Sequence, residues 1–491
     1  MTSALDVAQG GLGLIFAYLI GNAIYNVFFH PLRKYPGPLS HQLSAIPRSV
    51  HQIYGRLPFH IDQLHKKYGP VVRLAPDELV FSSAQAWNDI YGHRKAGAPE
   101  LVKYEKFYRL YKHNPQSILN ADKQAHSILR RRLANGFSER SLRDQEPIIG
   151  GYVNLLITRL KAAVNANSRQ NIREWYNWTT FDLIGDLSFG EGGFGCLVQT
   201  ENHPWIQLVS DTMSQGSMAQ ALCRLGFHSI ISWANQIGLM NDRKHHTIVH
   251  EKLGKRMESG ERPDFMEGLI THRTELGLTH KHLDMTAAVL VVAGSETTAT
   301  LLAGVTYYLT THPEILKRLQ AEVRSSFQSD EEINLLSVGN LSYMLACLNE
   351  ALRVHPPVAS NLPRLVPHGG VTIDGHFVPE NTIVSVCQYA VNRDKNLWTE
   401  PEKFAPERWL HDPKYKDDQL DSMQAFSVGP RACIGRNLAY AEMRLILAKV
   451  IYNFDFELAA DSRNWSRDQK AFDLSWVSPP LHVNLKPIAN Q

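Results

Sequence analysis

The chain has 491 residues, of which 44% are hydrophobic and 20% are charged, a composition typical of a folded globular protein rather than a disordered one. Its 51 lysines and arginines and 48 aspartates and glutamates give a formal net charge of +3, which argues against a strongly basic nucleic-acid-binding protein. The five cysteines are widely spaced and lack zinc-binding spacing, which argues against a disulfide framework and favours a reducing compartment.

The first predicted element is an uncharged stretch from Gly10 to Phe29, about 20 residues long and thus near the length that crosses a bilayer. No basic residue precedes it, so a cleaved secretory signal fits poorly. Arg33 and Lys34 follow it, and the positive-inside rule places them in the cytosol. We predict that residues 1–30 form a membrane anchor, although two asparagines weaken the stretch and a buried core helix is the alternative.

Residues 31–38 follow the anchor and form a proline-rich segment. Because proline fixes the backbone, we predict a stiff, non-helical connector that holds the following domain off the membrane. No internal repeat or second linker follows, so residues 39–491 are predicted to form one large domain.

Strand-like segments are short and lie at Val71–Leu74, Glu78–Phe81, Val371–Val378 and Ile383–Val386. The last two flank the turn-rich residues 379–382, which predicts a hairpin between them. Helical periodicity dominates the rest of the chain, and the sequence therefore predicts a mainly helical domain with a small sheet component.

The clearest helical periodicity lies in Ser141–Val164 and Leu438–Val450. Another apolar run, Leu283–Leu309, is long enough to span a membrane, but Glu296 lies at its centre, where an ionisable group is expensive in lipid. We therefore favour a long helix through a soluble domain, ended by Pro313.

The most informative motif reads FSVGPRACIG and begins at Phe426, matching F-x-x-G-x-R-x-C-x-G. A lone cysteine is usually a small buried hydrophobe, but the five fixed residues arise together by chance only about once in 10⁴ chains. Cys433 is suited to bind a haem iron as a thiolate, and Gly429 allows a bend that turns amides toward the sulfur. Phe426 shields the sulfur, Arg431 neutralises a haem propionate and Gly435 lets the next helix approach the porphyrin.

With this loop the chain resembles the cytochrome P450 family, over essentially its whole length and with the family's motifs in order. The resemblance implies a mainly α fold with a minor sheet subdomain and an N-terminal transmembrane helix. It also implies haem b (iron protoporphyrin IX) as cofactor, bound through the axial thiolate of Cys433 in a catalytic domain formed by residues 39–491.

The resemblance assigns further roles to charged side chains. Glu350 and Arg353 of an E-x-x-R motif, with Arg408, are expected to form a buried network that fixes the loop before the cysteine. His126 and Arg130 lie one helical turn apart and can both donate to a propionate, although the family usually has tryptophan at the first position. A solvated His126 is the alternative. The following residue resembles the family's third propionate ligand: Arg364.

On the central helix, Ala293, Gly294, Glu296 and Thr297 resemble the family's oxygen-activation motif. The small residues are expected to open a groove for dioxygen above the iron. Glu296 and Thr297 are expected to relay protons to the oxygen bound there. The alternative is a threonine that only bonds back to its own helix backbone.

The resemblance and the anchor together imply a single-pass protein of the endoplasmic reticulum membrane with a cytosolic catalytic domain. Electrons are expected from a membrane-bound NADPH–cytochrome P450 reductase. Five basic residues are candidates for a face that binds this donor, with an ordinary solvated surface as the alternative: Arg131, Arg132, Arg436, Arg444 and Lys449.

The substrate is expected to be an apolar small molecule, because the central helix carries apolar side chains toward the expected pocket. The pocket is expected to be lined by five segments: residues 92–120, 196–241, 286–296, 358–362 and 472–474. Three segments are similar to fungal members that tailor secondary metabolites: HPLRKYPGP at 30–38, PHGG at 367–370 and NLAYAEMRLILA at 437–448. Hydroxylation, epoxidation, ring closure and oxidative coupling all remain compatible.

Three other functions are weighed. A haem-thiolate isomerase or dehydratase needs no reductase, but such enzymes typically lack the acid–alcohol pair present here as Glu296 and Thr297. A non-enzymatic haem sensor usually carries an output domain, for which no sequence remains. A transporter built on the two apolar runs would stay insoluble without detergent after deletion of residues 1–30.

Overall fold

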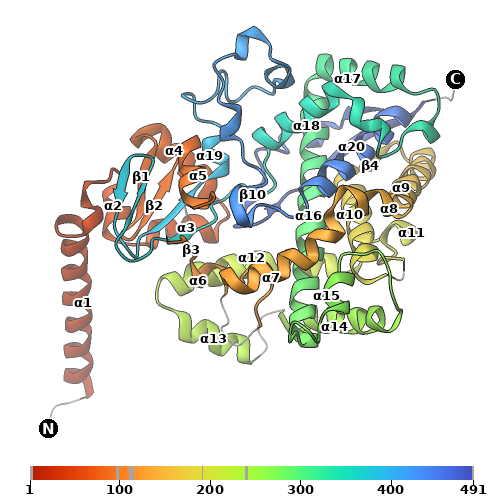
Figure 1. The fold of residues 1–491 in the computed structure, drawn as a ribbon. Coiled ribbons are helices and arrows are strands. Elements are labelled where there is room, and N and C mark those ends of the chain that lie inside the picture. The colour runs from red at the N-terminus through yellow and green to blue at the C-terminus, as the bar shows by residue number, and fades with distance from the viewer. Residues whose placement is uncertain (1–3, 95–98, 110–114, 191, 238–241, 489–491) are drawn as a thin grey trace.

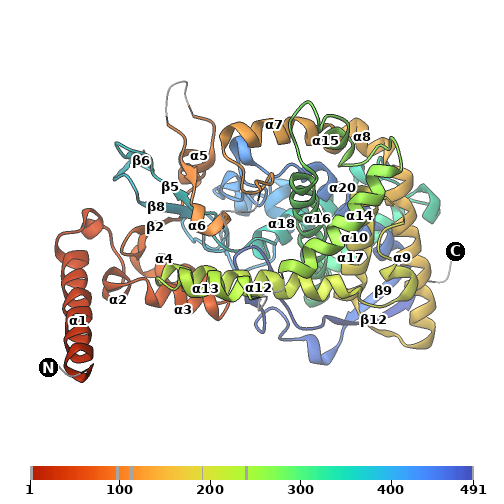
Figure 2. The same cartoon turned by 90° about the horizontal axis from the view of Figure 1, so that it is seen from below.

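The protein is described here by a computed structural model that covers residues 4–94, 99–109, 115–190, 192–237 and 242–488. It is mainly helical, and its larger sheet lies beside the N-terminal helices, whereas a smaller sheet lies at the other end, near the C-terminus (Figures 1 and 2). Its helices are α1 (Ala4–Phe28), α2 (Leu39–Leu43), α3 (Ile46–Ile53), α4 (Leu57–Tyr68), α5 (Ala84–Tyr91), α6 (Glu105–Tyr108), α7 (Lys123–Ala134), α8 (Glu139–Asp144), α9 (Glu146–Ala166), α10 (Ile172–Phe189), α11 (Cys196–Gln199), α12 (Pro204–Arg224), α13 (His228–Gln236), α14 (Asp242–Glu258), α15 (Glu267–Thr271), α16 (His280–Thr311), α17 (Pro313–Ser326), α18 (Ser342–Val354), α19 (Gln388–Val391) and α20 (Arg436–Asn453).

The strands form one larger sheet and several small ones, which agrees with the predicted minor sheet component. They are β1 (Val71–Ala75), β2 (Glu78–Phe81), β3 (Val102–Lys103), β4 (Arg169–Asn171), β5 (Arg364–Leu365), β6 (Val371–Ile373), β7 (His376–Val378), β8 (Ile383–Val386), β9 (Phe454–Leu458), β10 (Lys470–Ala471), β11 (Trp476–Val477) and β12 (His482–Pro487). The five-stranded sheet has the order β1-β2-β8-β5-β3, with β2 and β8 parallel and the other neighbours antiparallel.

The predicted hairpin around residues 379–382 is wrong. The predicted first strand, Val371–Val378, is itself a hairpin in which β6 and β7 pair with each other, and it does not pair with Ile383–Val386. Their turn is Asp374-Gly375, which takes positive φ values of 48° and 74°, as a tight hairpin turn requires. β8 is free to join the larger sheet beside β2, where all four of its residues are buried.

The long apolar run lies in α16, which crosses the middle of the molecule with α10 packed along it (Figure 1). This helix is long and apolar enough to span a membrane, yet 67% of its apolar window is buried inside the protein. The prediction of a core helix ended before Pro313 is confirmed. By contrast, the periodic stretch 141–164 is divided between α8 and α9, because Pro147 starts a new helix near its N-terminus.

The first helix, α1, projects from the rest of the molecule in both views (Figures 1 and 2). Large apolar side chains along it are exposed, among them Phe16, Tyr18 and Leu19, so the alternative of a buried core helix is wrong for the described residues. The apolar part found among the described side chains is Phe16–Phe28, which is shorter than a full membrane span.

The end of α1 and the connector are bonded to the folded domain. The Asn26 side-chain amide donates to the carbonyl of Leu43 at 3.1 Å, and the Arg73 guanidinium donates to the carbonyl of Asn26 at 3.0 Å. Residues 31–34 form a 3-10 turn, and the side chains of Leu32 and Tyr35 are buried in the core beside the larger sheet. The connector is thus neither non-helical nor a spacer; its apolar side chains make it part of the domain.

Candidate active site

The central helix and the cysteine-containing loop face each other across a cavity of about 630 Å³. The walls are mainly apolar and come from segments far apart in the sequence. All five segments predicted to form the pocket contribute lining residues: Asn120, Gln220, Val289, Leu362 and Leu474.

The cysteine loop positions a thiol on this cavity. Cys433 donates its backbone N–H to the carbonyl of Phe426 at 2.8 Å, which closes the loop. Gly429 has a φ of 75°, and a Cβ there would collide with the carbonyl oxygen of Tyr91, so glycine is required. The other four cysteines are buried, whereas the Cys433 thiol is accessible from the cavity.

The surroundings of the thiol act on its ionisation in two directions. Burial raises the pKa of Cys433, while a backbone hydrogen bond from Gly435 and the charges of Arg130 and Arg436 act to lower it. The helix predicted to follow the cysteine begins at Arg436, as α20, so the positive end of a helix lies near the sulfur. A metal ion would bind the thiolate and deprotonate the thiol outright.

Several basic side chains gather beside the cavity. Arg364 donates to the Tyr108 hydroxyl at 2.7 Å, and Arg431 donates to Glu100 at 3.2 Å. Lys103 lies against the Tyr108 ring, and burial followed by the charges of Arg364 and Arg431 lowers its pKa to about 6. These four charged residues, Lys103, Arg364, Arg431 and Glu100, are defined here as the basic cluster.

The basic cluster contains more positive than negative charge, and its side chains are largely shielded from solvent. Among the described residues Glu100 is its one carboxylate partner, and buried charges of one sign are costly without counter-charge. His126 lies beside the cluster with 7% of its surface exposed, so a solvated His126 is wrong. Its pKa falls to about 3 through burial and then the charges of Arg431 and Lys103. A ligand with two carboxylates, as haem has, would supply the missing negative charge, and the site therefore fits haem.

Arg130 was predicted to bind a propionate, and the other basic residues near it were predicted to face an electron donor. Arg130 donates to the carbonyl of Ala432 at 2.6 Å and so holds the residue before the cysteine. Lys449 is buried and bonded to Asp330 at 2.6 Å, so it is not part of any donor-binding face, because its charge is already neutralised inside the domain. Arg132 is paired with Glu275, whereas Arg131 and Arg436 are exposed.

The motif on α16 lines the opposite wall of the cavity. Ala293 and Gly294 face it, and a Cβ on Gly294 would lie 2.7 Å from Ile184, so this glycine also allows α10 to approach. The Thr297 hydroxyl donates to the Ala293 carbonyl at 2.6 Å, which is the back-bonding arrangement weighed as an alternative. Its oxygen can still accept a hydrogen bond from a group in the cavity.

Glu296 lines the cavity as well, but its carboxylate is turned toward α10. It accepts a hydrogen bond from the Asn177 amide at 3.0 Å and lies 3.5 Å from the Arg173 guanidinium. Burial raises the pKa of Glu296, although the Arg173 charge opposes the rise. The acid and the alcohol of the predicted pair are therefore adjacent, with different hydrogen-bond partners.

The E-x-x-R motif on α18 forms the predicted buried network. Glu350 accepts from Arg353 at 2.8 Å and from Arg408 at 3.0 Å, and the side chains are fully buried. Trp409 donates to the same carboxylate at 2.9 Å. Burial alone would raise the pKa of Glu350, but the charges of the two arginines outweigh it and lower the pKa. The network fixes the segment that leads to the cysteine loop.

Two residues of the cavity region escaped prediction from the sequence. Lys103 is a single basic residue at the end of the two-residue strand β3, with no spacing pattern to distinguish it. Glu442 on α20 lines the cavity, and neither carboxylate oxygen has a hydrogen-bond partner that meets the geometric criteria among the described residues. Burial raises the pKa of Glu442 to about 8, with the Thr298 side chain as the polar neighbour that opposes the rise. Nothing in a helical sequence marks one glutamate as buried.

Comparison with known proteins places this site in a family. The family model described as Cytochrome P450 matches residues 43–485. The chain is 50% identical over 480 residues to "Cytochrome P450 monooxygenase tpeC" of Talaromyces stipitatus, covering 97% of this chain and 94% of that protein. It is 41% identical to "Trichothecene C-15 hydroxylase" of Fusarium sporotrichioides (98% and 97% covered). It is also 40% identical to "Averantin hydroxylase" of Dothistroma septosporum (97% and 91% covered).

Proposed function

The chain belongs to the cytochrome P450 family, and on this premise we propose that it oxidises an apolar intermediate of fungal secondary metabolism. It is a haem-thiolate monooxygenase, which transfers one atom of dioxygen to its substrate and reduces the other to water with two electrons and two protons. The observation that carries the proposal is the apolar cavity between Cys433 and the Ala293–Thr297 segment, because it holds a ligand site and a substrate site together.

The chain's own residues would hold the cofactor at its iron and at its propionates. We assign the iron ligand to Cys433 and the propionates to the basic cluster with His126. When bound, haem supplies the iron at which dioxygen is activated. The Glu350 network contributes by holding the cysteine loop in place, since the loop itself has few regular backbone bonds.

On the substrate side, the proposed role of Glu296 and Thr297 is to hold and move protons. The raised pKa of Glu296 means that this carboxyl keeps a proton at higher pH than usual. Its neighbour Arg173 is partly exposed, which offers contact with solvent protons. Thr297 can accept or pass a hydrogen bond at the cavity wall, while the mainly apolar lining excludes water from the reaction.

For the reaction type, we propose hydroxylation ahead of epoxidation or oxidative coupling. Two relatives carry the word hydroxylase in their names, and both cover nearly the whole chain. The apolar lining formed by Val289, Leu362 and Leu474 suits a hydrocarbon-rich molecule.

For the electron source, we propose a membrane-bound NADPH–cytochrome P450 reductase, with the chain anchored in the endoplasmic reticulum by α1 and its domain in the cytosol. The exposed apolar side chains of α1 and the basic pair Arg33-Lys34 after it support this orientation. Arg131 and Arg436 are exposed and remain the candidates for contact with the donor.

The haem assignment is tested by the carbon monoxide difference spectrum of the reduced protein. The native chain is expected to give the Soret band of thiolate-ligated haem, and Cys433→Ser is expected to abolish it. Cys223→Ser serves as the matched control, because Cys223 is buried on α12 outside the loop. An unchanged spectrum in the Cys433 variant would refute the assignment. The substrate is a separate question, and a comparison of metabolite profiles with and without the enzyme plus reductase would identify it.

A further inference from the structure

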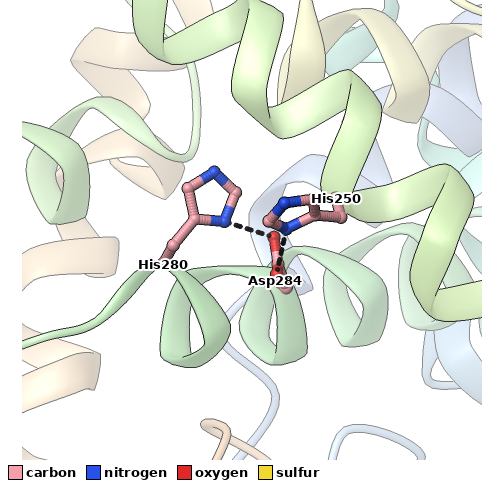
Figure 3. Close-up of side chains that lie close together, drawn as sticks. All are labelled: His250, His280 and Asp284. Carbon is pink, nitrogen blue, oxygen red and sulfur yellow. Dashed lines mark hydrogen bonds and ion pairs between the residues drawn. The ribbon is translucent and has the colours of Figure 1, made fainter.

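Three potential metal ligands meet where α14 crosses the start of α16 (Figure 3). His250 comes from α14, and His280 and Asp284 lie one turn apart on α16. The Asp284 carboxylate lies 2.9 Å from Nδ1 of His250 and 3.0 Å from Nδ1 of His280. One nitrogen or oxygen atom of each residue lies within 4.8 Å of those of the others.

Hydrogen bonding leaves part of this cluster unsatisfied. Asp284 is buried, and no arginine or lysine in the described part of the chain forms an ion pair with it. Oδ1 of Asp284 and Nδ1 of His280 are both buried and close together, yet neither makes a hydrogen bond of acceptable geometry. Buried polar atoms without partners are rare and costly, so a missing partner is indicated.

We propose that His250, His280 and Asp284 bind a divalent transition-metal ion, with Zn²⁺ as the best fit. Two imidazole nitrogens and a carboxylate oxygen are a preferred ligand set for this ion. Ligand atoms around tetrahedral zinc lie about 3.3 Å apart, so the two nitrogen–oxygen separations of 2.9 and 3.0 Å need only a small opening, and the two histidine nitrogens lie within 4.8 Å of each other. The His250 side chain is 62% exposed, which gives the ion an entry path and leaves a coordination position for water.

The proposed metal site lies beside the helices that cover the substrate cavity, so a bound ion would restrain these helices. None of the three ligands lines that cavity, but the adjacent Met285 on α16 and His245 on α14 do. α12, which contributes further lining residues, contacts α14. A metal ion that joins α14 to α16 would therefore restrain the α12–α14 cover without touching haem or substrate.

The site is tested with the haem-loaded, full-length protein after treatment with a chelator. ZnCl₂ is added, unbound ion is removed by dialysis, and zinc per chain is measured together with the dissociation constant from competition with a chromophoric chelator. We expect one Zn²⁺ per chain in the native protein. We expect His250→Ala and Asp284→Asn to weaken binding by at least about tenfold.

His368→Ala is the matched control, because this exposed histidine also lies beside a carboxylate, Glu380 at 2.6 Å, but without a third ligand. It should leave zinc binding unchanged. Because the His250 side chain is exposed, its alanine variant is expected to fold normally, and an unchanged haem spectrum verifies this. Native protein that binds zinc no more tightly than His250→Ala would overturn the proposal, as would equal loss in the His368 control.

Hydrogen exchange tests the restraint. Saturating Zn²⁺ is expected to slow amide exchange several-fold in α14 and in the first turns of α16 in the native protein, and to leave the His250 variant unchanged. Equal exchange with and without zinc would overturn the proposed effect on the cover. Zinc binding and amide exchange are both measured without turnover, so their outcome does not depend on the proposed function.

Discussion

At the residue scale, the active site is built from charges that the folded chain leaves partly uncompensated. Lys103 and Arg364 lie against aromatic rings rather than carboxylates, and Glu442 has no hydrogen-bonded partner among the described residues. Such groups reduce the stability of the protein alone and gain stabilisation when a complementary ligand is bound. Of these three residues the sequence predicted Arg364 as part of the site, but not Lys103 or Glu442.

Lys103→Met is expected to speed haem loss by about tenfold, because bound propionates would keep Lys103 protonated and the substitution removes that positive charge; a tenfold change corresponds to about 1.4 kcal/mol. Transfer of haem to an excess of a haem-binding acceptor measures the rate. Lys106→Met, which changes an exposed lysine on the nearby helix α6, should have no effect. Equal rates in the native protein and the Lys103 variant would remove this residue from the haem site.

Glu442→Gln is expected to stabilise the protein increasingly as pH rises. Because the pKa of Glu442 is raised to about 8 in the fold, the folded protein holds a proton that the unfolded chain releases near pH 4.5. The native protein is therefore most stable, with respect to this group, below pH 4.5 and loses that contribution as pH rises through 8. The difference in unfolding free energy should reach the order of 4 kcal/mol above pH 8.

Thermal unfolding of both proteins from pH 5 to pH 9 provides the measurement for Glu442. Other titrating groups are common to the two proteins and cancel in the difference. A difference that does not change with pH would show that Glu442 ionises normally.

At the element scale, the sequence predicted long elements well and short pairings poorly. The long apolar run and Pro313 predict the extent of α16 and the border with α17. A periodic pattern over many residues still predicts a helix when one residue departs from it. The hairpin at residues 379–382 was misplaced, because short strands pair by tertiary contact and the Asp374-Gly375 turn signal was overlooked. The direction of the Glu296 carboxylate was equally beyond prediction, since it depends on Asn177 and Arg173 of another helix.

The Glu350 network links α18 to the segment before the cysteine loop, and Glu350→Gln tests whether this link stabilises the fold. The change leaves the Arg353 and Arg408 guanidiniums buried without their shared anion, so a loss of about 3–5 kcal/mol is expected. Denaturant unfolding measures the stability, and the carbon monoxide spectrum measures the fraction with thiolate-bound haem. Glu407→Gln, whose carboxylate is partly exposed, is the control. Equal stability of the native protein and the Glu350 variant would refute a structural role for the network.

At the scale of the whole molecule, α1 and the connector behave differently. α1 exposes apolar side chains, whereas Leu32 and Tyr35 of the connector are buried in the domain. The folded part of the catalytic domain therefore begins near residue 30 rather than at residue 39. The sequence predicts a domain start at residue 39 because its prolines favour a linker. The prolines do not show that the side chains between them, Leu32 and Tyr35, are buried.

Two truncations test this border. Removal of residues 1–29 is expected to leave a folded, haem-binding protein that no longer needs detergent, whereas removal of residues 1–38 should cost on the order of 3 kcal/mol through the lost burial of Leu32 and Tyr35. Thermal unfolding and solubility after centrifugation measure both effects. Equal stability of the two truncated proteins would restore the connector as a spacer, and insolubility of the shorter truncation would revive the transporter alternative.

The bonds of Asn26 to Leu43 and of Arg73 to Asn26 tie the last turn of α1 to the domain. If the chain is anchored as proposed, these hydrogen bonds would restrict rotation of the domain relative to α1. One side of the molecule would then face the lipid surface most of the time. A second protein in the same bilayer would then meet it by a two-dimensional search over a narrowed range of orientations, with a higher local concentration than in solution. Loosening this joint with Asn26→Ala would leave the chemistry unaltered and slow the encounter.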